Sequence, residues 1–140
     1  MLFRSRFEGG ATPEVAVGTL LESTGEQLTW PGEADDKHTF GRICDTVQSR
    51  TVAGVFMAYD TNDNFGDFYC TAVGRYLMRV EAGEDPQVGD LLESNGKYAR
   101  VSMDQTDIKT YHVARVMGTS GSNHAADGSF CVAVELMIGG

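Results

Sequence analysis

The chain has 140 residues and a mass of 15.1 kDa, which fits one domain. Hydrophobic residues make up 41% of it, enough for a core that needs neither disulfides nor a metal. Eleven basic and twenty acidic residues give a net charge of −9, which argues against nucleic-acid binding. The apolar runs are too short to cross a bilayer and no signal peptide is present, so we expect synthesis in the cytoplasm and no membrane partner.

Residues 1–14 are predicted to form an N-terminal arm that precedes a single β domain at 15–140. The first seven residues alternate apolar with basic side chains, and Glu8-Gly9-Gly10 then releases the chain. In an acidic protein such an arm is a candidate for docking into an acidic groove of a partner. The candidate partner-binding residues of the arm are Phe3, Arg4, Arg6 and Phe7. The alternatives are a first strand that joins the sheet and a frayed terminus.

An internal repeat organises the rest of the chain. Residues 17–25 read VGTLLESTG and residues 88–96 read VGDLLESNG, so seven of nine positions are identical. A second correspondence follows at an offset of 61 residues, in which Val52 and Val55 match Val113 and Val116, and Cys70 matches Cys131. We therefore predict two copies, at about 15–81 and 86–138.

The apolar windows of both copies are typical of strands. They are short, rich in Val, Tyr, Phe and Thr, and separated by Gly, Asn and Asp, as at 52–57, 75–81 and 131–134. Asn95-Gly96 predicts a two-residue type I′ hairpin turn, and Thr24-Gly25 takes the same place in the first copy. The first copy is longer, and its surplus in or near 30–39 indicates an elaborated loop. The fold class is therefore mainly β, a single compact β-barrel or β-sandwich built from two internally repeated halves.

The segment that begins at Asp60 resembles the start of a calcium loop, because oxygen-bearing side chains occupy alternate positions. Phe65 and Thr71 stand where such a loop needs Gly and Glu. A solvated hairpin loop is the favoured interpretation. A weak cation site on Asp60, Asn62 and Asn64 is the alternative.

Nothing in the sequence forms a local catalytic motif. Three cysteines without C-x-x-C spacing predict buried, reduced thiols, and of the scattered histidines His38, His112 and His124 we interpret His112 as structural. The chain has no G-x-S-x-G, phosphate-binding glycine loop or H-E-x-x-H. We therefore predict no catalytic residue, no cofactor and no metal.

The second half of the chain resembles a known class of module. Ala72-Val73-Gly74 leads into a strand, residues 81–92 read EAGEDPQVGDLL, and a tract with Asp104 and Asp107 leads to 111–116 (YHVARV). This order resembles β-rich modules of tailed-bacteriophage structural proteins, including head-decoration proteins and the C-terminal domains of tail fibres. The resemblance covers about the last sixty residues. It implies a non-enzymatic virion protein that self-associates, often as a homotrimer.

Two functions follow as expectations. The first is a capsid decoration protein, or cement protein, on the head surface of the virion, with the major capsid protein or other virion proteins as partners. The alternative is a tail-fibre tip or tail adaptor module that binds a host receptor or glycan. In that alternative, Trp30 beside Pro31 is the candidate contact residue.

Overall fold

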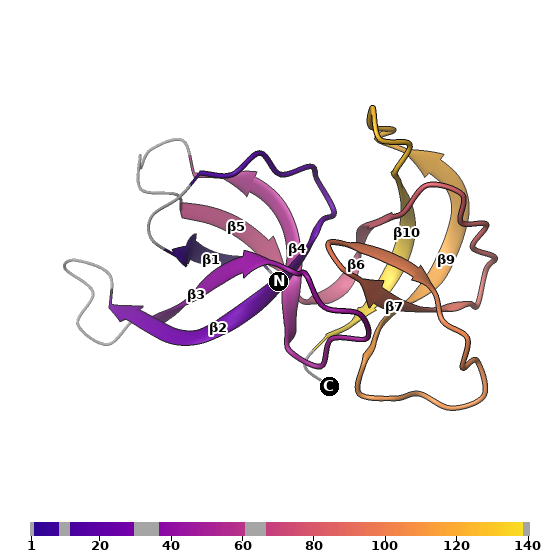
Figure 1. Ribbon diagram of the computed structural model, residues 1–140, viewed down its shortest axis with the longest axis horizontal. Helices are drawn as coiled ribbons and strands as arrows, with labels where there is room; N and C mark the ends of the chain where they lie inside the picture. The colour runs from indigo at the N-terminus through magenta and orange to yellow at the C-terminus, as the bar shows by residue number, and fades with distance from the viewer. Residues whose placement is uncertain (1, 9–11, 30–36, 61–66, 139–140) are drawn as a thin grey trace.

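The computed structural model describes residues 2–8, 12–29, 37–60 and 67–138 (Figure 1). Within these residues the chain forms ten strands. They are β1 (Leu2–Phe7), β2 (Leu20–Thr29), β3 (Lys37–Ile43), β4 (Val52–Tyr59), β5 (Asp67–Thr71), β6 (Val73–Val80), β7 (Leu91–Asn95), β8 (Tyr98–Val101), β9 (His112–Ser122) and β10 (Phe130–Met137).

The strands close into two five-stranded barrels that lie side by side (Figure 1). The first has the order β1-β3-β2-β4-β5, and the second has the order β10-β6-β8-β7-β9. β1 is parallel to β3 and antiparallel to β5, and β6 is likewise parallel to β8 and antiparallel to β10. The remaining neighbours pair antiparallel in both barrels. The prediction of a mainly β barrel protein built from two repeated halves is confirmed, and each half closes as a barrel.

The pairing registers show how closely the barrels correspond. Glu22 lies opposite Arg42 in the first barrel, as Glu93 lies opposite Arg100 in the second. The register between the second and fourth strands shifts at the same place in each barrel, directly before these glutamates. A further shift between the fourth and fifth strands falls at Met57 in the first barrel and at its counterpart Met117 in the second. Shared bulges at matching positions indicate two copies of one fold.

The prediction that the later strands of the two copies correspond at one offset of 61 residues is wrong. Glu22 faces Val52, whereas Glu93 faces His112, so the fourth strands match at an offset of 60. Phe56 faces Cys70 and Val116 faces Val134, so the fifth strands match at an offset of 64. The offset changes because the second barrel has longer loops after β8 and after β9. Cys70 and Cys131 are therefore not equivalent.

The predicted boundaries of the arm and of the copies also need correction. Residues Leu2–Phe7 are not a free arm but β1, which pairs with both β3 and β5 and closes the first barrel. β6, assigned to the first copy, opens the second barrel. The two copies are therefore β1–β5 and β6–β10. The sequence placed the boundary too late because the clear repeat starts only at the second strand of each copy.

The tight turn of the second copy differs from the prediction. Asn95 pairs with Tyr98, so Gly96 and Lys97 are the two central residues. Gly96 has a φ of +82° whereas Lys97 does not have a positive φ, which is the pattern of a type II′ turn rather than type I′. In the first copy, β2 and β3 continue to pair beyond Thr24-Gly25, after a register shift. The residues by which the first copy exceeds the second therefore lie in the longer β2–β3 hairpin, as predicted.

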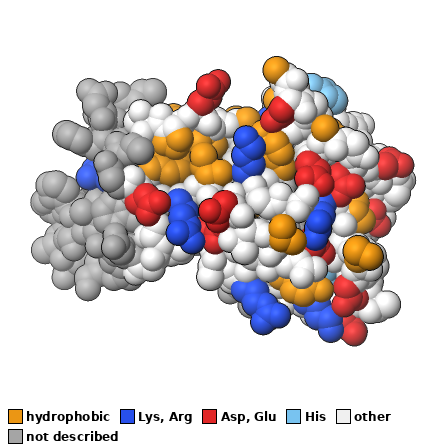
Figure 2. Space-filling model, in the orientation of Figure 1, with side chains coloured by type: hydrophobic (Ala, Val, Ile, Leu, Met, Phe, Trp, Pro, Cys, Tyr) orange, Lys and Arg blue, Asp and Glu red, His pale blue; other side chains and the backbone are white. Residues whose placement is uncertain are grey.

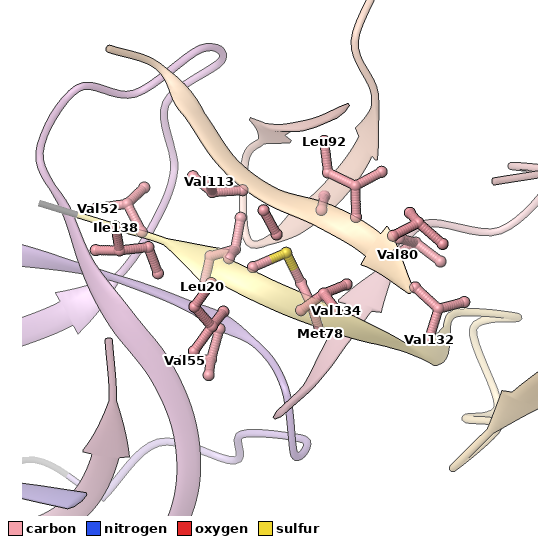
Figure 3. Packing of buried hydrophobic residues seen from close by; sticks show 14 of the residues in the cluster. Leu20, Val52, Val55, Met78, Val80, Leu92, Val113, Val132, Val134 and Ile138 are labelled. Atoms are coloured by element: carbon pink, nitrogen blue, oxygen red, sulfur yellow. The ribbon is translucent and has the colours of Figure 1, made fainter. Parts of the chain in front are cut away.

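The hydrophobic core consists of two clusters. A small cluster lies within the first barrel and contains Phe7, Leu21, Phe56, Phe68 and Cys70. The larger cluster fills the second barrel and extends into the first. Leu20, Val52 and Val55 belong to this larger cluster although their strands are in the first barrel, and Leu20 lies among Met78, Val113 and Val134 (Figure 3). The two barrels therefore share one core.

Backbone contacts reinforce this junction. The Gly18 carbonyl accepts a hydrogen bond from the Arg79 amide at 3.0 Å, and the Leu20 amide donates to the Lys97 carbonyl at 2.9 Å. The buried Ser94 hydroxyl donates to the Thr46 carbonyl (2.9 Å) and accepts from the Ser49 amide (2.7 Å). One end of the first barrel thus docks on the β6 and β7–β8 region of the second.

The corresponding end of the second barrel is covered by its own chain. The loop at 102–111 brings the Gln105 side chain onto Leu91, which is the counterpart of Leu20. The Leu91 amide donates a hydrogen bond to Gln105 Oε1 at 2.8 Å. His112 stands in the place of Val52, and the exposed Arg115 stands in the place of Val55. The contact between the barrels is therefore not reciprocal.

Candidate functional site

Four candidate docking residues lie in β1. Phe7 is buried in the first core, and the backbone of Phe3 pairs with Cys70. The guanidinium of Arg6 donates to the fully buried carboxylate of Asp67 at 2.5 Å, and Arg4 adds a contact at 3.4 Å. The side chains of Arg4, Arg6 and Phe7 hold β1 against β5, so they do not form a mobile docking arm. Trp30, the fifth candidate, lies outside the described residues.

Asp60, the first residue of the candidate cation loop, is engaged by its neighbours. It is 6% exposed, forms an ion pair with Arg4 at 3.5 Å, and accepts a hydrogen bond from the Tyr69 hydroxyl at 3.4 Å. Asn62 and Asn64 lie outside the described residues. In the part of the chain that the structure describes, no cluster of three or more His, Cys, Asp or Glu side chains could hold a metal ion.

His112 has the structural role that we predicted. It is buried, its Nδ1 accepts a hydrogen bond from the Lys109 amide at 2.8 Å, and its Nε2 lies 2.9 Å from the Ser102 hydroxyl. These contacts fold the loop at 102–111 over β9. His124 instead stacks its ring on Phe130, with ring centroids 5.8 Å apart. The side chain of His38 lies outside the described part.

All three cysteines are buried and reduced, as predicted. Burial raises the pKa of the Cys44 thiol to about 11 and that of Cys70 to about 11, and it also raises the pKa of Cys131. A nucleophilic cysteine needs a thiolate near neutral pH. These thiols therefore act as small core side chains rather than as nucleophiles.

Sequence reasoning missed the two buried glutamates of the repeat. Glu22 is 2% exposed and Glu93 fully buried. Glu22 accepts hydrogen bonds from the Asp45 amide (3.0 Å) and the Thr51 hydroxyl (2.9 Å). Arg42 lies 3.7 Å from it. Burial alone would raise the pKa of Glu22, but these and other hydrogen bonds outweigh burial and lower it to about 2.

Glu93 is held in a similar way, by two hydrogen bonds from Arg100 at 2.9 and 3.2 Å. The available signal was a charged residue at the same place of both copies, directly after two leucines. The repeat in the sequence does not show whether such a residue is exposed or is buried with an ion-pair partner. The structure assigns both glutamates to cross-strand pairs that tie the second strand of each barrel to the third.

Sequence reasoning also missed a pocket on the second barrel. It has a volume of about 340 Å³ and lies between the loop at 84–87 and the β9–β10 hairpin. Its lining combines two carboxylates, an imidazole, a phenyl ring and a hydroxyl, from Glu84, Asp85, His124, Phe130 and Thr119. Polar groups that converge beside aromatic rings are typical of a binding site.

Comparisons with protein-family models, with curated proteins and with solved structures found no match for this chain. Among the described residues, no helix is long and apolar enough to span a membrane.

Proposed function

We propose that the chain is a structural protein of a bacteriophage virion, specifically a decoration protein that binds the outside of the assembled head. In this proposal it contacts the major capsid protein, self-associates as a homotrimer, and acts by binding rather than by catalysis. The observation that carries the proposal is that buried carboxylate and imidazole side chains, which could serve in catalysis, make structural contacts instead. Asp67, Glu22, Glu93 and His112 are buried, and their contacts hold strands and loops together.

A shared core supports the same proposal, because it makes the two barrels one stiff body. Leu20 and Val55 are fully buried although they project out of the first barrel, and they pack in the cluster that fills the second. A decoration protein that locks neighbouring shell subunits needs such stiffness, since a pliable body would lose conformational entropy on binding.

The surface offers contact area for a protein partner. Acidic and basic side chains are interspersed on the face seen in Figure 2. On the second barrel, the loop at 102–111 and the turn before β7 expose apolar side chains: Met103 is 96% exposed, Val88 66% and Ile108 60%. Contiguous patches of exposed apolar groups mark protein contacts, and methionine is enriched in them. We assign the shell-binding surface to this end of the second barrel.

The test uses heads that lack the decoration protein. The purified chain is mixed with them, sedimented, and located on the particles by electron microscopy. The proposal expects saturable binding at symmetry-related positions on the head. Recovery of the chain on tails would favour the tail-tip alternative, and binding to neither would refute a virion role.

A matched pair of variants tests the assigned surface. Met103→Asp removes exposed apolar area and adds a charge, and it should weaken shell binding about tenfold or more. Thr106→Asp adds the same charge to the same loop and should bind much as the parent chain does. Equal affinities for the two variants would exclude Met103 from the interface.

A further inference from the structure

The second barrel has an uncovered sheet face along three neighbouring strands, with β10 paired to β6 on one side and to β9 on the other. Exposed positions alternate with buried ones in the middle of β10, so Ala133 and Glu135 point away from the core. Exposed or half-buried side chains of β6 and β9 flank them. We define the outer face by six side chains: Val73, Arg75, Leu77, Arg115, Met117 and Glu135.

A row of three charges crosses the outer face. Glu135 lies opposite Arg75 in β6 and opposite Arg115 in β9, and all three side chains are exposed. Two positive charges and one negative charge give the row a net charge of +1, whereas the whole chain carries −9. The outer face is therefore locally positive on a protein whose remaining surface is acidic.

Other arginines of the chain are used inside the fold. Arg6 pairs with the buried carboxylate of Asp67, and Arg100 pairs with that of Glu93. Among the described residues, every ion pair within 4 Å involves side chains outside the charged row. The two arginines of the outer face are therefore available to a partner.

The first barrel buries the equivalent of this face. Val55 pairs with Thr71 in the register in which Arg115 pairs with Glu135. Val55 is fully buried and Thr71 is 5% exposed, and Val55 belongs to the core cluster that the two barrels share. Within the chain, one barrel thus docks on the other through this surface. The second barrel keeps the same surface open, with charges in place of the apolar contact.

We propose that the outer face binds the acidic surface of a second molecule of this chain, in a head-to-tail contact. Charge selects the occupant: two chains of −9 repel each other, but the positive face of one attracts the acidic remainder of the next. Val73, Leu77 and Met117 add apolar area beside the charged row. Contacts between unlike surfaces close rings, so the inference rests on the self-association in the proposed function and supplies a surface for the homotrimer.

Sedimentation equilibrium of the full chain and a matched pair of variants tests the proposal. Arg115→Glu changes the net charge of the outer face from +1 to −1, and it should weaken self-association about tenfold or more. Arg50→Glu makes the same change at an exposed arginine outside this face and should associate as the parent chain does. Equal association of the two variants would overturn the proposal. If Arg115→Glu does not fold, Arg75→Glu replaces it with the same expected result.

Glu135→Gln separates the head-to-tail contact from its alternatives. The variant raises the net charge of the outer face to +2, so binding to an acidic surface should become tighter, and added salt should weaken it. Two outer faces that pair with each other would need Glu135 opposite an arginine of the other molecule. Weaker association of Glu135→Gln would indicate that arrangement, and unchanged association would confine the row to cross-strand contacts; either result would overturn the proposal.

Binding to heads is measured in parallel, so that this inference and the proposed function fail separately. A parent chain that stays monomeric at 15.1 kDa but decorates heads would overturn the inference and leave head binding intact. A chain that trimerises through the outer face but binds no heads would support the inference and refute the virion role. Loss of head binding by Arg115→Glu, with a monomeric parent chain, would assign the face to the shell protein and contradict the inference.

Discussion

Replacing Gly18 by alanine tests the junction between the two barrels. Gly18 has a φ of +85°, and an added Cβ would lie 2.9 Å from the Arg79 amide nitrogen and 3.0 Å from the Cys131 sulfur. The positive φ alone costs about 1–2 kcal/mol for a residue with a Cβ. Crowding at the junction adds about 1–3 kcal/mol, because the carbonyl of Gly18 must move away from Arg79. The expected loss of unfolding free energy is therefore about 2–5 kcal/mol.

The repeat provides a matched control for this variant. Gly89 is the counterpart of Gly18, has a φ of +93°, and an added Cβ would meet no atom within 4 Å. Gly89→Ala should therefore lose only the cost of the backbone, about 1–2 kcal/mol. Urea denaturation of both variants measures the difference. Equal losses would show that the close approach of Gly18 to Arg79 does not stabilise the protein.

Three further predictions concern buried groups. Because the folded state lowers the pKa of Glu22 from 4.5 to about 2, this residue stabilises the fold above pH 4.5 and loses that contribution, about 3 kcal/mol, as the pH falls to 2. The unfolding free energy of Glu22→Gln should therefore fall less steeply than that of the parent chain between pH 4.5 and pH 2. An identical pH dependence in the two proteins would contradict the assignment. Cys44 and Cys70 should resist a thiol reagent at pH 8 in the folded protein and react after denaturation, whereas rapid labelling of the native chain would contradict their burial. His112→Ala should destabilise the fold by about 1–3 kcal/mol and increase hydrogen exchange in the loop at 102–111; unchanged exchange there would mean that other contacts hold the loop.

The strands and the duplication could be predicted because both leave local marks in the sequence. Short apolar windows and the shared LLES motif identify the second strand of each copy. The first strands carry no such mark: LFRSRF and RYLMRV share a position only at Arg6 and Arg79, which the pairing registers bring into correspondence. The sequence therefore predicts an arm where β1 forms, and it predicts β6 in the wrong copy.

The site residues were harder to predict because their roles depend on partners far along the chain. The alternation of Arg4 and Arg6 is the same for a free arm and for a strand, and only Asp67, more than sixty positions away, decides between them. The same holds for the buried glutamates. Only the pairing registers show that Glu22 lies opposite Arg42 and Glu93 opposite Arg100.

The covered end of the second barrel makes the two halves of the repeat unequal. The equivalent end of the first barrel is apolar at Val52 and Val55, whereas the second barrel has His112 there, beneath its own loop at 102–111, and the exposed Arg115. The first half therefore buries this end against the second half, and the second half shields the same end with a segment of its own. Two copies of one fold have thus acquired different tasks in packing: one supplies apolar side chains to the common core and the other receives them.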